Sequence, residues 1–328
     1  MNNVKVSVLV AVYNAERTLK RCLESLLDQT LNNIEVICVD DCSTDDSLNI
    51  LNSYSSRDSR IKVFRLLENK GQAVARNMGL DKSCGDFICF LDSDDWLAVD
   101  ALEKAVMTFE KHPFTDCVLF KVYFVENGKE REYPMSFFSV MSGYDAFIGS
   151  LTWKVHGWYM VRASLHKRFP YDDSCKSYSD DNTTRIHYYY SREVRCCQGT
   201  YYYYFNETSV TKKPSVRRFD YIKANESMKS QLIALKVSDD VIRVYETERW
   251  KILVDTYMFY FLNRKKLAQK DSFFGLSELK RVWSSIEIDK VDSSLKKKFG
   301  YIPLRFSWSL FRLQEETYFL LKKLLGII

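Results

Sequence analysis

Apolar runs alternate with amphipathic segments over the first hundred residues of the chain. Four runs rich in β-branched or aromatic residues predict strands: "VKVSVLVAV" (4–12), "IEVICVDD" (34–41), "IKVFRL" (61–66) and "FICFL" (87–91). Helical spacing and cap signals predict helices between them, over residues 15–29, 42–56 and 71–83, with Ser43 and Thr44 as N-cap candidates. Strands separated by helices of this length imply crossover connections and a largely parallel sheet.

Polar and aromatic side chains follow the ends of these strands. Tyr13 follows the first strand, Asp40 and Asp41 end the second, and "DSDD", residues 92–95, follows the fourth. Because ligands of open α/β sheets bind outside the carboxyl ends of the strands, we expect these residues to converge at one edge. Three carboxylates within four positions repel one another unless a cation or hydrogen-bond donors lie among them. An Asp-rich turn that caps the next helix is the alternative interpretation.

The residue types at this edge suit one class of ligand. An aromatic ring and a carboxylate suit a nucleobase, carboxylates suit a divalent cation, and Lys70 or Arg76 on the third connection suits phosphate. Neither GxGxxG nor GxxxxGK[ST] follows the first strand, which disfavours a dinucleotide or P-loop site. The sequence therefore predicts a nucleoside diphosphate site in which metal holds the phosphates.

The remaining sequence changes character twice. A helix is predicted from Asp100 to Lys111 and a strand over 116–125, and another strand is predicted to begin at Gly199 and enter a turn by Thr211. From Ser215 onward the pattern is helical and charged. The 328 residues are enough for one large domain with an appendage, or for two domains.

Charge and cysteine usage exclude several classes of protein. The formal charge of +5 is spread among interspersed acids, so a nucleic-acid partner is not expected. Nine cysteines without a CxxC pair and four histidines without an HExxH cluster support neither zinc nor a disulfide framework. The opening "MNNVKVSVLVAVYN" lacks a signal-peptide pattern, so we expect a cytoplasmic protein.

Four segments together carry a resemblance to a known family. "VSVLVAVYNAERTLKRCLESLLDQT", "IEVICVDDCSTDDS", "NKGQAVARNMGLDKSCGDFICFLDSDDWL" and "SDDNTTRIH" occur in this order. They resemble the inverting nucleotide-sugar glycosyltransferases of family two, of the bacterial surface-polysaccharide type, over roughly residues 4–210. The resemblance implies a GT-A fold, a Rossmann-like mixed, mostly parallel sheet flanked by helices. Residues 1–105 would form the nucleotide-sugar-binding half, 106–215 the acceptor-binding half, and 216–328 a helical C-terminal region.

The resemblance also implies roles for individual residues. Tyr13 would stack on or flank the uracil, near the backbone of Ala11. Asp41 would accept from the base N–H, Asp40 would support the turn, and Arg76 would lie near base and phosphates. Further along, Asp92 and Ser93 would lie near the ribose, Asp94 would ligate Mg²⁺ or Mn²⁺, and Asp95 would shape the site. Asp181 would be the catalytic base, beside Asp180.

General chemistry supports such roles. A divalent cation neutralises charge on a diphosphate leaving group, and Mg²⁺ commonly uses one or two carboxylates plus substrate phosphates. The acceptor hydroxyl needs a base on the opposite face of the sugar. Alternatives stay open: Asp180 and Asp181 also fit a helix cap, where the family has Glu-Asp, and Asp173 is a second candidate base. Trp153 and Trp158 fit either an acceptor site or the core.

The last third of the chain carries two further signals. "ETERW", residues 246–250, nearly matches the QxxRW motif of processive synthases, but no apolar run of eighteen residues could form a channel. We therefore interpret it as helix surface and core and expect transfer of one sugar per encounter.

The second signal is the mixture of Lys and Arg with Phe, Trp and Leu after Lys296, at positions 296–298, 305, 312, 322 and 323. This composition is typical of an interfacial amphipathic segment, which would bring the site to a polyprenyl-linked acceptor at the cytoplasmic face of the inner membrane. A helix packed on the protein's own body or on a partner subunit is the alternative.

Three functional classes follow from these observations. The first is a metal-dependent transferase that moves sugar from a nucleotide-sugar donor to a glycan or lipid-linked acceptor in polysaccharide biosynthesis. The second is a nucleotidyl- or phosphotransferase, whose expected Gly-rich or basic phosphate-binding signature is missing. The third is a catalytically inactive nucleotide-binding scaffold of the same fold.

Overall fold

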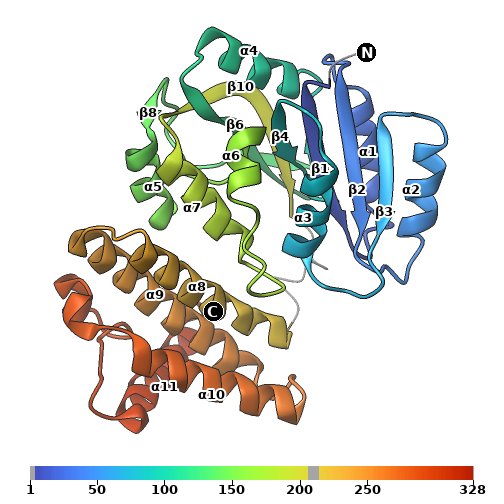
Figure 1. Cartoon of the computed structure of the whole chain (residues 1–328). Helices are drawn as coiled ribbons and strands as arrows, with labels where there is room; N and C mark the ends of the chain where they lie inside the picture. Colours follow the sequence, from blue (N-terminus) through green and yellow to red (C-terminus); the bar gives the residue numbers. More distant parts are fainter. Residues whose placement is uncertain (1–3, 206–213, 328) are drawn as a thin grey trace. The chain divides into compact units, whose positions relative to one another are not determined.

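The computed structural model describes residues 4–205 and 214–327. The chain divides into two compact units (Figure 1). The first unit contains Met1–Lys176 with Asp180–Glu207, and the second contains Ser177–Ser179 with Thr208–Ile328.

The first unit is an α/β structure built on a single mixed sheet. Its strands are β1 (Val6–Val12), β2 (Ile34–Asp40), β3 (Ile61–Arg65), β4 (Phe87–Phe90), β5 (Trp96–Leu97), β6 (Thr115–Glu126), β7 (Lys129–Glu132), β8 (Met141–Ser142), β9 (Tyr159–Arg162) and β10 (Glu193–Tyr204). Its helices are α1 (Leu19–Leu27), α2 (Ser47–Ser55), α3 (Gln72–Lys82), α4 (Ala101–Lys111), α5 (Gly143–Leu151), α6 (Ala163–Arg168) and α7 (Asp180–Tyr190).

The sheet has the order β3-β2-β1-β4-β9-β6-β10-β5 among the described residues. The four strands predicted in the first hundred residues are confirmed, and they pair in parallel. Beyond β4 the sheet becomes mixed, because β9 pairs antiparallel with both β4 and β6, while β10 runs parallel to β6. β10 begins at Glu193, earlier than predicted, and the turn predicted up to Thr211 lies outside the described residues.

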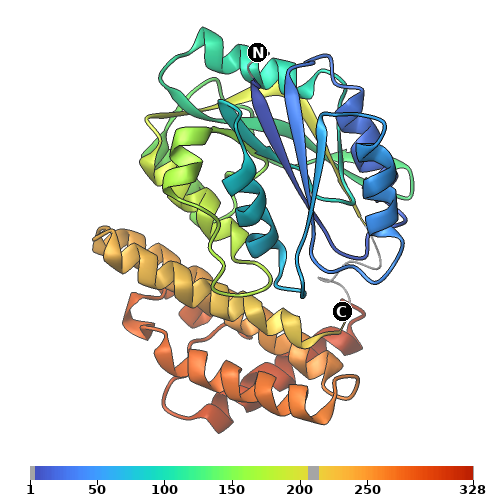
Figure 2. The ribbon, with the colours of Figure 1, turned by 45° about the vertical axis from the view of Figure 1, so that its right-hand side comes forward.

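Alternation along the strands places helices on both faces of the sheet (Figure 2). Val8, Val10 and Val12 of β1 share a buried cluster with Leu23 of α1 and Leu102 of α4. On the other face, α3 approaches closely at Gly79, where an added Cβ would lie 3.3 Å from the Leu9 side chain. Both faces of the central strands are therefore covered, which explains their continuous apolar runs.

The predicted start of α2 is wrong by a few residues. The helix begins at Ser47 after Asp46 instead of at the Ser43-Thr44 pair. Ser43 Oγ instead accepts from the Asn14 backbone N–H at 3.0 Å, and the Thr44 N–H donates to Asn14 Oδ1 at 2.8 Å. These bonds join the turns that follow β1 and β2, and they take the place of capping bonds.

The second unit is helical, as predicted from Ser215 onward. It contains α8 (Asp220–Ala234), α9 (Asp239–Asn263), α10 (Gln269–Ser285) and α11 (Trp308–Leu324). Aromatic side chains dominate its core, including Phe219, Trp250, Tyr257, Phe311 and Phe319. No helix in the described ranges is both long enough and apolar enough to cross a bilayer.

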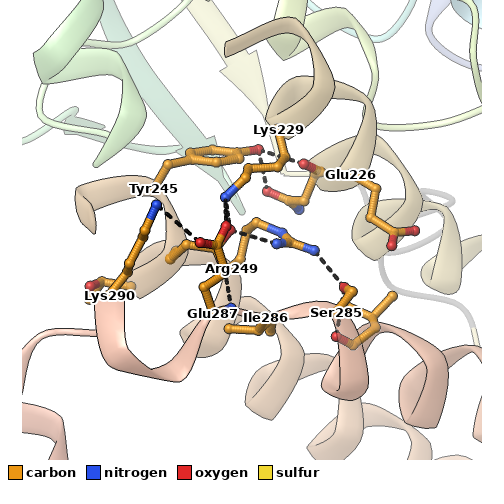
Figure 3. Close-up of polar contacts among 12 residues, drawn as sticks. Glu226, Lys229, Tyr245, Arg249, Ser285, Ile286, Glu287 and Lys290 are labelled. Atoms are coloured by element: carbon orange, nitrogen blue, oxygen red, sulfur yellow. Dashed lines mark hydrogen bonds and ion pairs between the residues drawn. The ribbon is translucent and has the colours of Figure 1, made fainter. Parts of the chain in front are cut away.

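The "ETERW" segment lies inside the second unit, on α9. Glu246 is fully buried, and its Oε1 accepts from Lys229 Nζ at 2.6 Å and from Arg249 Nη1 at 2.7 Å. Its Oε2 accepts from the backbone N–H of Glu287 at 2.9 Å (Figure 3). Trp250 is also fully buried, so this segment is helix core and contributes little to the surface. The interpretation as helix core is confirmed for four of the five residues, and Glu248 is half-buried and pairs with Lys251.

Candidate active site

The turns after β1 and β2 carry the first residues of the candidate site. Ala11 is half-buried on β1, and Tyr13 is exposed just beyond the strand. Asp40 is fully buried, accepts from the Ser43 N–H and pairs with Arg65 Nε at 3.2 Å. Asp40 thus holds the turn in place, while Tyr13 presents its ring at the surface.

Asp41 fixes the loop between β3 and α3. Its Oδ1 accepts from the Lys70 N–H at 2.7 Å, and its Oδ2 accepts from the Gly71 N–H and from Asn69 Nδ2, each at 2.9 Å. Gly71 adopts φ of 97°, and an added Cβ would lie 2.7 Å from the carbonyl oxygen of Lys176. Lys176 Nζ in turn donates to the Asn69 carbonyl at 2.8 Å. The loop is therefore packed between the end of β2 and the segment that precedes α7.

Arg76 of α3 joins the end of β4 to the start of α7. The guanidinium is 1% exposed; Nη2 donates to Asp92 Oδ1 at 2.5 Å and Nη1 donates to Asp180 Oδ2 at 3.0 Å. The Arg76 guanidinium also lies 4.4 Å from the centre of the Phe90 ring. Asp92 and Asp180, which are far apart in the sequence, are thus joined by one buried cation.

The carboxylates around Arg76 outnumber the cations that they contact. Burial raises the pKa of Asp92, and Asp180 raises it further, while Arg76 opposes the rise. Burial raises the pKa of the Asp181 carboxyl to about 7; Asp180 adds to this rise, while Arg185 and Arg76 oppose it. Asp181 is half-buried in the first turn of α7, so its side chain can exchange a proton near neutral pH.

Asp95, the last residue of "DSDD", has a structural role. Its fully buried carboxylate accepts from Tyr201 Oη and from the Tyr204 N–H, each at 2.7 Å. Burial raises the pKa of Asp95 well above its ordinary value, and the charges of Asp92 and Asp94 add to the rise. Ser93 and Asp94 are half-buried, and the Asp94 carbonyl accepts from Arg21 Nη2 at 2.8 Å.

A divalent cation would have few protein ligands at this edge. The described residues contain no group of three or more His, Cys, Asp or Glu side chains arranged to hold a metal. The carboxylate of Asp95 is buried against β10, and Asp92 Oδ1 already accepts from Gln72 and Arg76. One or two carboxylates completed by phosphate oxygens fit Mg²⁺ or Mn²⁺, whose protein sites commonly take this form.

The other candidates from the sequence lie around this centre in different ways. Asp173 is exposed in the loop before α7, and Trp153 is partly exposed after α5. Trp158 packs against the core beside Tyr201 and Tyr203. Trp158 is therefore part of the sheet packing, whereas Trp153 remains accessible, with the Arg185 guanidinium 5.3 Å from its ring centre.

Two residues of the site were missed by sequence reasoning. Gln72 Nε2 donates to Asp92 Oδ1 at 2.6 Å, and Asn69 Nδ2 binds Asp41. Asn69 lies in the loop between β3 and α3, and Gln72 is the first residue of α3. Their neighbours Lys70 and Arg76 were noticed because they are charged. The signal that would have found Asn69 and Gln72 is position: they follow a strand whose end lies at the same sheet edge.

Comparisons with known proteins identify the family and the fold. The family profile described as "Glycosyl transferase family 2" matches residues 7–171, half of the chain. The chain belongs to this family. The match spans β1 to α6 and ends before α7, so it includes the strand ends that carry Tyr13, Asp41 and Asp92 but excludes Asp181.

Curated relatives support the family 2 assignment over part of their length. An uncharacterized glycosyltransferase of Haemophilus influenzae is 42% identical over 142 residues, which cover 40% of this chain and 57% of that protein. The poly(ribitol-phosphate) beta-glucosyltransferase of Bacillus spizizenii is 38% identical over 122 residues, covering 36% of this chain and 19% of that protein. The chain thus matches less than two thirds of either relative.

Solved structures support the fold of this family 2 member. The S. aureus TarS 1–349 crystal structure superposes with a TM-score of 0.70 at 22% identity, covering 96% of this chain and 91% of that one. A second structure of the same protein, in complex with UDP-GlcNAc, gives a TM-score of 0.69. The likeness extends over the helical C-terminal region as well, and it establishes the GT-A fold.

Proposed function

We propose that this chain is an inverting glycosyltransferase that moves one sugar per encounter from a nucleoside-diphosphate sugar to a hydroxyl of a glycan or lipid-linked acceptor. The observation that carries the proposal is the Arg76 bridge from Asp92 to Asp180. This bridge brings the sheet edge expected to hold the donor beside Asp181, the residue expected to deprotonate the acceptor. A nucleotide-binding edge next to a carboxylate with a pKa of about 7 is what a single displacement at the sugar C1 requires.

In this mechanism Asp181 is the base. A carboxylate with a pKa near the working pH accepts a proton more effectively than an ordinary Asp, and it still releases that proton to solvent after transfer. The acceptor oxygen attacks C1 as the bond from C1 to the diphosphate breaks, and its proton passes to Asp181. Attack from the side opposite the leaving group inverts the configuration at C1.

Other residues of the chain hold the two substrates. Tyr13 has an exposed ring on which the base would stack. Asp41, which is fixed by the 69–71 loop, would accept a hydrogen bond from a base N–H such as that of uracil. Asp92 and Ser93 lie beside the expected ribose, and Asp94 is the proposed ligand of Mg²⁺ or Mn²⁺. The metal, when bound with the diphosphate, would neutralise the charge that develops on the leaving oxygen.

The biological setting is proposed from the relatives. The Bacillus relative is a poly(ribitol-phosphate) beta-glucosyltransferase, and a solved relative of the same fold was crystallised with UDP-GlcNAc. We therefore propose a UDP-hexose or UDP-N-acetylhexosamine donor and a role in bacterial polysaccharide biosynthesis. The enzyme would work in the cytoplasm, peripheral to the inner membrane.

The decisive experiment is calorimetric titration of UDP, GDP and dTDP into the purified chain, with and without Mn²⁺. We expect UDP to bind most tightly, to require the metal, and to lose at least about tenfold in affinity in Asp94→Ala, since a carboxylate ligand would be lost. Asp81→Ala, which removes an exposed carboxylate from α3, is the matched control and should bind as the wild type does. Hydrolysis of UDP-sugars, beginning with UDP-GlcNAc, then identifies the donor.

Two results would overturn the proposal in different ways. If no nucleotide binds with any metal, the acidic edge is a structural turn and the donor assignment is lost. If UDP and metal bind but no UDP-sugar is ever consumed with any acceptor, the inactive scaffold becomes the better interpretation.

A further inference from the structure

Helix α11 carries a stripe of exposed leucines. Leu310, Leu313, Leu320, Leu321 and Leu324 are all exposed, the last at 82%. With 3.6 residues per turn these five side chains fall within an arc of about 100°, which Thr317 completes. The opposite side of the same helix buries Phe311, Glu315 and Phe319 in the second unit. The helix is therefore fixed to its own unit by one face and leaves the leucine stripe without a protein partner among the described residues.

Exposed apolar residues also flank both ends of the helix in the sequence. Phe306, just before α11, is 80% exposed, and Leu325 and Ile327, just after it, are also exposed. A soluble surface tolerates single leucines, but a contiguous apolar strip of this length marks an interaction site. Its composition is purely aliphatic and aromatic apart from Thr317.

Tyrosine and lysine side chains border the stripe. Tyr318 lies about 60° round the helix from Leu321, on one side of the stripe, and Lys323 lies about 60° from Leu320, on the other side. Lys322 falls on the side of the helix that buries Phe311 and Glu315, and its Nζ lies 5.2 Å from the Tyr318 ring centre. The Tyr318 ring also contacts Tyr301, and Lys298 Nζ lies 4.4 Å from the Tyr301 ring centre. Tyrosine rings and lysine ammonium groups beside an apolar surface suit the headgroup level of a bilayer.

The charge of the segment favours an anionic partner. From residue 296 to the end, the sequence contains seven Lys and Arg residues but only two acidic residues, Glu315 and Glu316. Glu315 is fully buried and burial raises its pKa to about 8, so it carries little negative charge at neutral pH. The segment is thus strongly basic beside its apolar stripe.

We propose that the leucine stripe of α11, with its Tyr and Lys border, docks this enzyme flat on an anionic membrane surface. A second copy of the chain is the other occupant to consider, since the leucine spacing resembles a heptad seam. That seam extends over only about two heptads with Thr317 in its middle, whereas coiled coils are identified by three or four. The docking deepens the proposed function, because a lipid-linked acceptor lies at such a surface, and it rests on that function only for its biological meaning.

The test is co-sedimentation of the full chain with vesicles, in the absence of any nucleotide or acceptor. Vesicles of phosphatidylcholine alone are compared with vesicles that also contain phosphatidylglycerol. We expect binding to the anionic vesicles only, weakened more than about tenfold in the triple variant Leu313→Ser, Leu320→Ser, Leu324→Ser. Replacing Lys323 by Gln should weaken it by about fivefold.

The matched control is Ile233→Ser with Leu262→Ser, which changes two exposed apolar residues of α8 and α9 in the same unit. Control and stripe variants should both keep the helical circular dichroism of the wild type, and the control should bind vesicles normally. Failure of the wild type to bind anionic vesicles, or equal binding by the triple variant, would overturn the proposal. A dimer in solution that the triple variant abolishes would assign the stripe to a second copy. None of these results depends on transferase activity, so they are distinguishable from failure of the proposed function.

Discussion

The two units each contain a cluster of buried charge, and the two clusters differ in balance. In the first unit one guanidinium, Arg76, contacts both Asp92 and Asp180. The charges of these three residues also shift the pKa of Asp181. In the second unit one carboxylate, Glu246, contacts both Lys229 and Arg249 and also a backbone N–H. The first cluster has fewer cations than carboxylates. In the second, both oxygens of the buried Glu246 carboxylate are hydrogen-bonded, and Lys229 also binds Glu287.

This difference separates a candidate site from a structural core. Carboxylates that share too few cations have raised pKa values and keep the capacity to bind a proton or a metal ion. A carboxylate whose two oxygens are both bonded in the core contributes to packing and has little left to offer a ligand. Glu246 of "ETERW" is such a structural carboxylate, and Arg249 is one of its partners, although the segment resembled a functional motif in the sequence.

The largest expected effect comes from Asp181→Asn. The variant keeps the size of the side chain and removes the proposed base, so transfer should fall by about 10²- to 10⁴-fold. UDP binding measured by calorimetry should stay within about threefold, because Asp181 is not proposed to contact the nucleotide. The same substitution at the exposed Asp173 is the control, and loss of transfer there instead would make Asp173 the base.

Substitutions in the charge cluster of the second unit should lower stability more than substitutions in the cluster of the first unit. Glu246→Ala leaves Lys229 and Arg249 without their shared carboxylate, and breaking a buried pair in this way costs about 3–5 kcal/mol. Asp180→Asn, at a partly exposed position of the first cluster, should cost no more than about 1 kcal/mol. Hydrogen exchange of the α9 and α7 amides measures each unit separately. Equal losses in both would contradict the distinction drawn between the clusters.

Glu315 tests the same idea with a buried carboxylate that accepts a hydrogen bond from Gln314 Nε2 at 2.8 Å and has no ion pair among the described residues. Its Oε2 has no hydrogen-bond partner in the described part of the chain, and burial raises its pKa to about 8. A raised carboxyl pKa means that the folded state binds the proton more tightly than the unfolded state. The free energy of unfolding should therefore fall as pH rises from about 4.5 to about 8, by at most about 5 kcal/mol.

Glu315→Gln should remove this pH dependence. The variant should be more stable than the wild type above pH 8, and its advantage should shrink as the pH falls toward 5. Urea unfolding across this range measures the difference between the two proteins. A constant difference at all pH values would mean that Glu315 is ionised in the folded protein.

Asp181 should also set the pH profile of transfer. Because Asp181 must be deprotonated to act as a base and its pKa lies near 7, kcat/KM should fall about tenfold for each pH unit below 7. Arg76→Gln removes a positive charge that lowers the pKa of Asp181, so it should move this inflection to higher pH. Initial rates at subsaturating donor give the profile. An inflection unmoved by Arg76→Gln would show that the two charges are not coupled.

Sequence reasoning succeeded where the signal was local. The runs that end at Val12, Asp41 and Leu91 form parallel strands because each is a buried β-branched or aromatic segment followed by a helix. The meeting of Arg76 with Asp180 could not be read in this way, because it depends on β9 inserting antiparallel between β4 and β6. The start of α2 failed for a similar reason, since the Ser43 hydroxyl is bonded to Asn14, almost thirty residues away.

Gly71 shows how closely the two ends of the site are linked. Its backbone N–H is held by Asp41, and its Cα faces the Lys176 backbone so closely that a single methyl group would not fit without movement. A change that adjusts the loop for a different nucleobase would therefore also displace the chain that leads into α7. Under the proposed function, substitutions at position 71 should therefore change donor preference and acceptor preference together.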